Sequence, residues 1–297
     1  MSQFYKKQTL IRTISFMAFF VAINVVCSFL TVVLPLLGLI LIILLPLTSA
    51  VVEVYCKDRW FPIYAFATIG LSIVVTLSSI DFTIFYVVPS IFTGYIFGLF
   101  AKKHLPSMYA IFIATIIQTL LSFAFIPLIE LITGTNLIMS FAKILRISDI
   151  FLFKSLILLI FFIVSLIQTI LSFIVVKNEL TKITQETLWT SIQEKVSSYS
   201  ALAGCFLAIG MLFIYVPVCY LLVGVSFYFA VFVIIEMFKN NNRLGLILAS
   251  ISLFAELLLF ALLNRYFSDG KEFILLLIAQ FMISMYSICC SFLKKSS

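Results

Sequence analysis

Residues 177–198, KNELTKITQETLWTSIQEKVSS, are the longest stretch of this chain that lacks the composition of a membrane span. On a helical wheel the apolar side chains between residues 186 and 196 share one sector, and the polar ones lie opposite. The apolar set is Leu188, Trp189, Ile192 and Val196. We therefore expect an amphipathic linker helix over residues 178–198, lying along the inner membrane face. It is either a solvated linker or a docking surface for a partner, in which case Leu188, Trp189 and Ile192 form the interface.

The chain on both sides of this linker has the composition of a membrane protein. Of its 297 residues, 64% are hydrophobic and 10% are charged, whereas ordinary soluble domains carry about 25% charged residues. A transmembrane helix needs about 20 apolar residues, and Pro residues and charges set the breaks between such spans. The predicted fold is an all-α polytopic membrane protein of about ten transmembrane helices, with a six-helix domain over residues 1–177, the linker over 178–198 and a four-helix domain over 199–297. The spans cover roughly residues 11–34, 36–55, 60–79, 83–101, 107–130, 151–176, 199–215, 218–238, 244–263 and 273–293.

The distribution of Lys and Arg predicts the orientation of these spans. Cytoplasmic loops of membrane proteins carry an excess of basic residues. With the N-terminus inside, fourteen of the nineteen Lys and Arg residues fall on the inner side. Both termini are therefore expected inside, and the net charge of +7 needs no nucleic-acid partner to explain it.

Small residues mark two of the predicted spans. Ser15, Ala18 and Ala22 share one face of the first span, and Gly94 and Gly98 form a GxxxG pattern in the fourth. Small side chains let membrane helices approach each other closely. We expect the glycines to pack inside the protein, whereas the face of Ser15, Ala18 and Ala22 suits either internal packing or a partner.

Acidic residues within the apolar spans are costly and need a reason. Glu256 is the deepest of them, twelve residues into the ninth span, and it is either an ion- or proton-coupling group or a protonated structural residue. Glu53 lies close to the inner surface, where we expect it to reach water. The outer loop, residues 131–150, contains an amphipathic stretch that predicts an interfacial helix.

The chain lacks the sequence motifs of the common enzyme classes. It has no HExxH, GxSxG or Walker motif, and its six cysteines form no CxxC. The single histidine, His104, follows two lysines in a predicted loop. We therefore expect no enzyme activity, no catalytic residues, no metal site and no cofactor.

One short segment occurs twice. Residues 117–123, IQTLLSF, and residues 167–173, IQTILSF, are identical at six of seven positions. The narrow composition of the chain also makes a coincidence plausible.

The first half resembles a known class of transport proteins. It has a short basic N-terminus, an Ala-x-x-x-Ala pattern at Ala18 and Ala22, a Leu-Pro-Leu-Leu-Gly turn at residues 34–38, and six spans before residue 177. These features resemble the substrate-binding S components of energy-coupling-factor transporters. The chain as a whole is similar to a family of bacterial membrane proteins with an S-component-like N-terminal half and additional C-terminal spans.

This resemblance implies a function and a set of contacts. The protein would be the substrate-binding membrane component of a vitamin or cofactor-precursor uptake system in the bacterial plasma membrane. Ala18 and Ala22, with Ser15 beside them, would pack against the energising membrane subunit, which works with its own ATPases. A small-molecule ligand would lie toward the outer side, among the few polar groups there, which are Asn24, Asp81, Glu130, Asn136, Arg146 and Asp149.

Two alternatives belong to other functional classes. The chain would be a secondary transporter if Glu256 couples substrate movement to an ion. It would be a non-transporting membrane scaffold if residues 178–198 recruit a partner. A co-purifying ATPase pair, a co-purifying small molecule or a soluble partner would distinguish the three.

Overall fold

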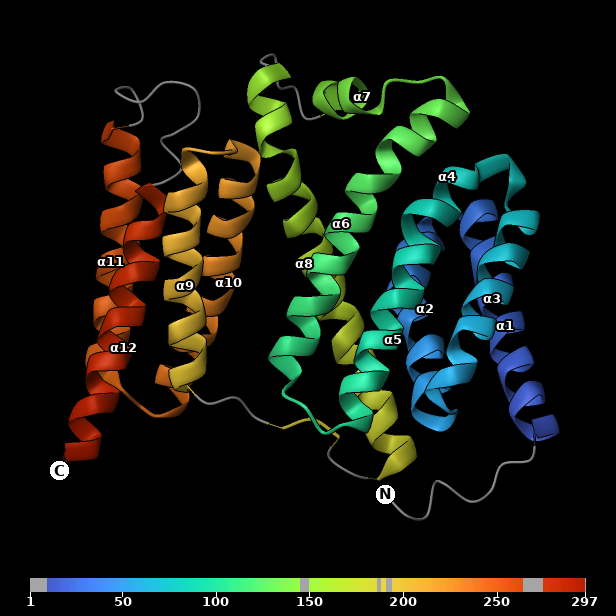
Figure 1. Cartoon of the computed structure of the whole chain (residues 1–297), viewed down its shortest axis with the longest axis horizontal. Helices are drawn as coiled ribbons and strands as arrows, with labels where there is room; N and C mark the ends of the chain where they lie inside the picture. Colours follow the sequence, from blue (N-terminus) through green and yellow to red (C-terminus); the bar gives the residue numbers. More distant parts are fainter. Residues whose placement is uncertain (1–9, 145–149, 186–187, 191–193, 264–274, 297) are drawn as a thin grey trace. The chain divides into compact units, whose positions relative to one another are not determined.

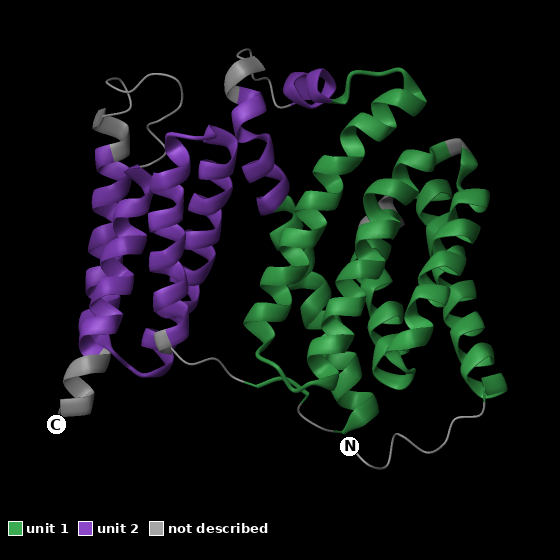
Figure 2. Cartoon of the chain, viewed as in Figure 1, with its two compact units in different colours: residues 1–137, 164–191 green, residues 138–163, 192–297 purple. Residues whose placement is uncertain are grey.

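The computed structural model describes residues 10–144, 150–185, 188–190, 194–263 and 275–296. Helices account for nearly all of this part of the chain (Figure 1). Two compact units are present (Figure 2). Unit 1 contains Met1–Leu137 and Val164–Ser191, and unit 2 contains Ile138–Ile163 and Ile192–Ser297. The two units therefore differ from the predicted domains, which were divided at residue 177, because residues 138–163 belong to the same unit as the C-terminal helices.

Unit 1 is a bundle of helices joined by short turns. Its long helices are α1 (Leu10–Val33), α2 (Pro35–Tyr55), α3 (Phe61–Val75), α5 (Val88–Lys102), α6 (Ser107–Thr133) and the second part of α8 (Ile150–Thr184). Only Leu34 separates α1 from α2, and Pro35 opens α2, where a missing backbone N–H costs nothing. Each predicted span of this half corresponds to one of these helices.

The helix that contains the fourth predicted span begins with a change of pitch. The 3-10 turn η2 (Leu77–Ser79) and the short helix α4 (Ile80–Phe82) lead into a π-helical turn, η3 (Thr83–Val87), before α5 begins. Pro89 follows directly. Proline has no N–H for the carbonyl four residues earlier and its ring crowds that group, so a wider turn just before Pro89 relieves the conflict.

The GxxxG pattern of α5 packs inside unit 1, as predicted. A Cβ atom added at Gly98 would lie 2.6 Å from Glu53 Cβ and 2.8 Å from the Ala50 carbonyl oxygen, and one added at Gly94 would clash with the Pro46 carbonyl oxygen. The two glycines therefore allow α5 and α2 to approach each other along this line.

An amphipathic helix follows α6, as predicted for the outer loop. α6 ends at Gly134, whose φ of 66° is the left-handed conformation typical of a glycine after a helix. The short helix α7 (Leu137–Ile144) then begins, and the Leu137 N–H donates to Glu130 Oε1 at 2.9 Å. Glu130 thus caps the first turn of α7, where a carboxylate is favoured.

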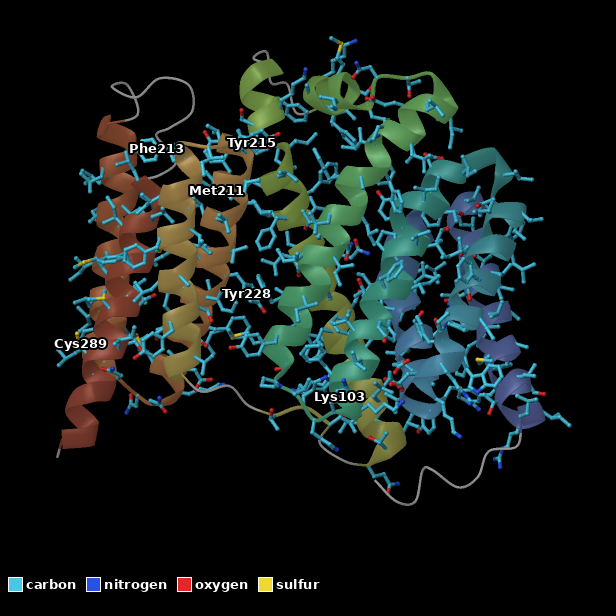
Figure 3. The ribbon with its side chains drawn as sticks, viewed as in Figure 1. Lys103, Met211, Phe213, Tyr215, Tyr228 and Cys289 are labelled. Atoms are coloured by element: carbon cyan, nitrogen blue, oxygen red, sulfur yellow. The ribbon has the colours of Figure 1, made fainter. Side chains whose placement is uncertain are left out.

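Unit 2 contains the remaining helices. Beside nearly all of α7 and the first part of α8, they are α9 (Glu194–Leu212), α10 (Val216–Lys239), α11 (Arg243–Leu263) and α12 (Ile278–Ser296). α9 and α10 form a tight hairpin, and Figure 3 labels Met211, Phe213 and Tyr215 near its turn. Phe213 and Tyr215 are exposed there, although water would disfavour both apolar surfaces.

The helices have the length and surface of a multi-pass membrane protein. Among the described residues, five helices are long and apolar enough to cross a bilayer, and three shorter apolar helices accompany them. Large apolar side chains such as Phe66 (80% exposed) and Leu131 (83% exposed) lie on the outside. Exposed apolar surface on this scale fits a hydrocarbon environment.

The predicted amphipathic helix over residues 178–198 is wrong. α8 continues to Thr184, residues 188–190 are not helical, and α9 begins at Glu194. Thr190 forms an isolated bridge with Pro106, and its hydroxyl donates to a backbone carbonyl of the α5–α6 turn at 3.3 Å. Pairing with this turn therefore replaces the helix that the apolar periodicity predicted.

Two apolar residues of this segment, Leu188 and Trp189, pack against unit 1, whereas Val196 is 40% exposed. Leu188 is buried, and the Trp189 ring meets Phe173 of α8 edge-on with 5.3 Å between ring centroids. For Leu188 and Trp189, the apolar character therefore corresponds to packing inside unit 1. Ile192, the third residue of the predicted partner interface, lies outside the described residues.

Candidate functional site

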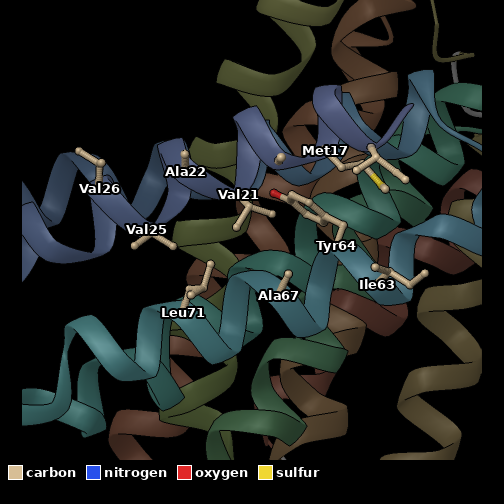
Figure 4. A pocket seen from close by; sticks show the side chains of 11 residues that line it. Met17, Val21, Ala22, Val25, Val26, Ile63, Tyr64, Ala67 and Leu71 are labelled. Carbon is tan, nitrogen blue, oxygen red and sulfur yellow. The ribbon is translucent and has the colours of Figure 1, made fainter. Parts of the chain in front are cut away.

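An apolar groove of about 520 Å³ lies between α1 and α3 in unit 1 (Figure 4). α1 lines it with every third or fourth residue, and α3 supplies the opposite wall. The lining residues include Met17, Ala18, Val21, Ala22, Tyr64 and Ala67. The groove is therefore a surface that α1 and α3 share within the span of both helices.

Small side chains give this groove its width. Ala18, Ala22 and Ala67 are exposed, and so is Ser15 one turn earlier on α1. The side of α1 that packs inward carries other residues, among them Asn24 and Ser28. Ser15, Ala18 and Ala22 thus lie on the outside of unit 1 and take no part in its internal packing.

A buried hydrogen-bond network supports the groove from behind. Asn24 of α1 donates to the Tyr64 hydroxyl of α3 at 2.6 Å, and Thr48 of α2 donates to Asn24 Oδ1 at 2.8 Å. Ser49 lies 3.3 Å from the same Tyr64 hydroxyl. A buried side-chain amide is costly unless both its NH2 group and its carbonyl oxygen form hydrogen bonds. Asn24 of α1 meets this condition through its bonds to α2 and α3.

The other predicted ligand residues lie near the end of unit 1 where α6 meets α7. Asp81 of α4 and Asn136 of the α6–α7 turn are exposed, and Glu130 caps α7. The structure thus brings Glu130 and Asn136 into one turn, whereas Asn24 takes part in the network behind the groove. Arg146 and Asp149 lie outside the described residues.

A charged cluster at the other end of unit 1 is a feature that the sequence did not predict. Lys102 of α5 donates to the Cys56 carbonyl oxygen at 3.1 Å and to Asp58, and its Nζ lies 3.7 Å from Glu53 Oε1. The side chain of Glu53 is 1% exposed, so the expectation that it reaches water is wrong. Lys102 thus ties the end of α2 and the following turn to the end of α5.

The exposed member of this cluster has a perturbed pKa. The hydrogen bond from Lys102 is the largest influence on Asp58, and it lowers the pKa of this carboxyl below its ordinary value. A carboxyl group with a lowered pKa in the folded state stabilises the fold above its unfolded pKa, and this contribution is lost as the pH falls through the folded value. The contact between Lys102 and Asp58 therefore remains intact at neutral pH.

The two copies of the repeated segment meet in the structure. Gln118 of α6 donates to Gln168 Oε1 of α8 at 2.6 Å, and Thr169 donates back to Gln118 Oε1 at 3.2 Å. Thr93 of α5 lies 3.4 Å from the same oxygen. Side-chain hydrogen bonds of this kind hold membrane helices together, so the shared Gln-Thr pair has a packing role whatever its origin.

Within the described residues, no group of three or more His, Cys, Asp and Glu side chains is placed to hold a metal ion.

Comparison with known proteins finds no relative of this chain. The chain matches no family model, no curated protein and no solved structure.

Proposed function

We propose that this protein is the substrate-binding membrane component of a vitamin or cofactor-precursor uptake system, similar to an energy-coupling-factor S component. The observation that carries the proposal is the outward-facing groove of α1 and α3 with Ala18 and Ala22 in its wall. Since lipid tails are as apolar as these side chains, a close-fitting groove of small residues favours another helix through van der Waals packing. The expected occupant is a helix of the energising membrane subunit.

The ligand would bind at the opposite end of unit 1 from the Lys102 cluster. Asp81, Glu130 and Asn136 supply polar groups there, and the apolar side chains of the neighbouring helix ends of unit 1 would supply the walls. A small-ligand site needs this combination of an apolar cup and a few placed polar groups.

Adding bulk to the groove tests the proposal. In wild-type protein purified from its native membrane, we expect an energising membrane subunit and a pair of ATPases to co-purify, as identified by mass spectrometry. Ala18→Leu combined with Ala22→Leu fills the groove and is expected to reduce this association at least tenfold. Ala124→Leu, which adds the same bulk at an exposed position of α6, should leave it intact.

Two results would overturn the proposal. One is wild-type protein that carries no ATPase pair, and the other is an association that survives in the double variant. Circular dichroism and size-exclusion chromatography of the double variant check that it still folds, and Ala18→Leu alone provides a milder change if it does not.

The proposed topology has ten spans with both termini inside. In unit 1 the described basic residues near helix ends support it, since Lys57, Arg59, Lys102 and Lys103 lie at the α2–α3 and α5–α6 turns. In a cysteine-free background, a single cysteine at Lys103 should react only with reagents added from the inner side. A single cysteine at Thr135, which is also exposed, should react only from outside. Labelling of both positions from the same side would contradict the proposed orientation.

A further inference from the structure

α12 of unit 2 has its polar side turned inward. Gln280, Ser284 and Ser287 are at most 2% exposed, whereas Met282 and Met285 on the other side of the helix are 48% and 40% exposed. The spacing of the three polar residues places them on one face. This face packs inside the unit, where Ser287 accepts a hydrogen bond from Ser198 of α9 at 2.8 Å. A membrane helix with this arrangement exposes its apolar side to lipid and borders a polar interior.

Glu256 of α11 is held at the start of this helix. It is 4% exposed, and its Oε2 accepts the backbone N–H of Ala279, the second residue of α12, at 2.8 Å. Among the described residues, no Lys, Arg or His nitrogen lies within 4.0 Å of its oxygens. The positive end of the α12 dipole is therefore the feature here that stabilises an ionised Glu256.

The residue that follows Ala279 in α12 carries a buried acceptor that lacks a donor. Gln280, which directly follows Ala279, is 2% exposed, and its Oε1 has no hydrogen-bond partner. An amide oxygen can only accept a hydrogen bond, and a buried acceptor without a donor is costly. An ionised Glu256 has no proton to donate, whereas a protonated Glu256 has one.

We propose that Glu256 is a proton-binding site of unit 2 and that the start of α12 accommodates both of its protonation states. In the ionised state the carboxylate accepts the Ala279 N–H. In the protonated state, a proton taken from water sits on the other carboxyl oxygen and is donated to Gln280 Oε1. The proton returns to water on release, and no other bond is made or broken. This site belongs to unit 2 and does not depend on the function proposed for unit 1.

The other titratable side chains that the surrounding helices carry in this interior are cysteines and tyrosines, whereas Glu236 and Lys239 pair with each other at the end of α10. α9 contributes Cys205, which is close enough for its thiol to interact electrostatically with Glu256. α10 contributes Cys219, which packs in one cluster with Cys205 and Leu277, together with Tyr220 and Tyr228. On α12, Tyr286 bonds to Asn242, which precedes the first residue of α11. Thiols and phenols are neutral near pH 7. A change of charge in this interior would therefore come from Glu256 itself.

Infrared difference spectroscopy of the full chain in lipid nanodiscs tests the proposal. Between mildly alkaline and mildly acidic pH, the carbonyl stretch of a buried protonated carboxylic acid should appear. We expect this band to be lost in Glu256→Gln and to shift in frequency in Gln280→Leu, because the acid loses its acceptor. Glu236→Gln is the control, since that carboxylate pairs with Lys239 at 2.7 Å on α10, and its substitution should leave the band unchanged.

The outcomes separate a proton site from a structural carboxylate. A band that persists in Glu256→Gln, or the absence of any such band in wild-type protein, would overturn the proposal. If Glu256→Gln does not fold, Gln280→Leu alone decides, because an unshifted band there would show that the acid does not bond to Gln280.

Discussion

Replacing Lys102 with methionine is expected to lower the free energy of unfolding of unit 1 by about 3 kcal/mol. Lys102 is the partner of a carboxylate whose side chain is 1% exposed, and removing one member of a buried ion pair typically costs about 3–5 kcal/mol. Its ammonium also binds the Glu53 and Cys56 carbonyl oxygens at the end of α2, where a cation is favoured. Methionine keeps most of the length and apolar surface of the side chain, so the loss of stability can be attributed to the missing positive charge.

Equilibrium unfolding in detergent micelles measures this effect, with two variants for comparison. Lys103→Met changes the next residue, which is exposed, and should alter stability by less than about 0.5 kcal/mol. Adding Glu53→Gln to Lys102→Met should recover part of the loss, since it removes the unpaired charge. If Lys102→Met is as stable as Lys103→Met, the cluster does not stabilise the fold.

Gly98→Ala is expected to destabilise the same unit by about 1–3 kcal/mol, the usual cost of overpacking a close contact. The added methyl group would lie 2.6 Å from Glu53 Cβ and 2.9 Å from its Cγ, and the Ala50 carbonyl oxygen is 2.8 Å away. Two of these three atoms are fixed to the α2 backbone or directly bonded to it, so the clash is relieved only if α5 moves away from α2. That movement would also lengthen the contact between Lys102 and Glu53.

Gly70→Ala is the matched control for this prediction. Gly70 lies in α3, and an added Cβ atom there would meet no atom within 4 Å. Alanine is favoured over glycine in a helix by up to about 1 kcal/mol, so this variant should be neutral or more stable. Thermal or denaturant unfolding of both variants in one detergent gives the comparison, and equal effects at the two positions would contradict the close approach of α5 to α2.

The positions of the helices could be predicted from the sequence. A bilayer demands apolar runs of a certain length, and proline and charge end them, so the predicted spans correspond to helices within a few residues. The close approach at Gly94 and Gly98 was also predictable, because four-residue spacing places both glycines on one face and nothing but a neighbouring helix benefits from their small size. The amphipathic helix α7 followed from the same periodicity in the outer loop.

The apolar periodicity gave a wrong prediction where another part of the fold contacts the chain. Residues 188–196 have a helical pattern, yet Thr190 pairs with the α5–α6 turn and Trp189 packs on Phe173. Tertiary contacts with α8 and with the α5–α6 turn outweighed the local preference of this segment for a helix. The distance along the chain between residues 106 and 190 hid this contact.

The candidate sites depended on how each helix is rotated about its axis, and only the tertiary structure decided this. In a soluble protein the polar face of a helix marks the outside, but a membrane span is apolar nearly all round and carries little such information. The sequence therefore showed the small residues Ala18 and Ala22 without showing that they face outward, and it showed Glu256 without its contact to the Ala279 N–H. Likewise, Glu53 and Lys102 are 49 residues apart, and they meet because the glycines of α5 bring its backbone against α2.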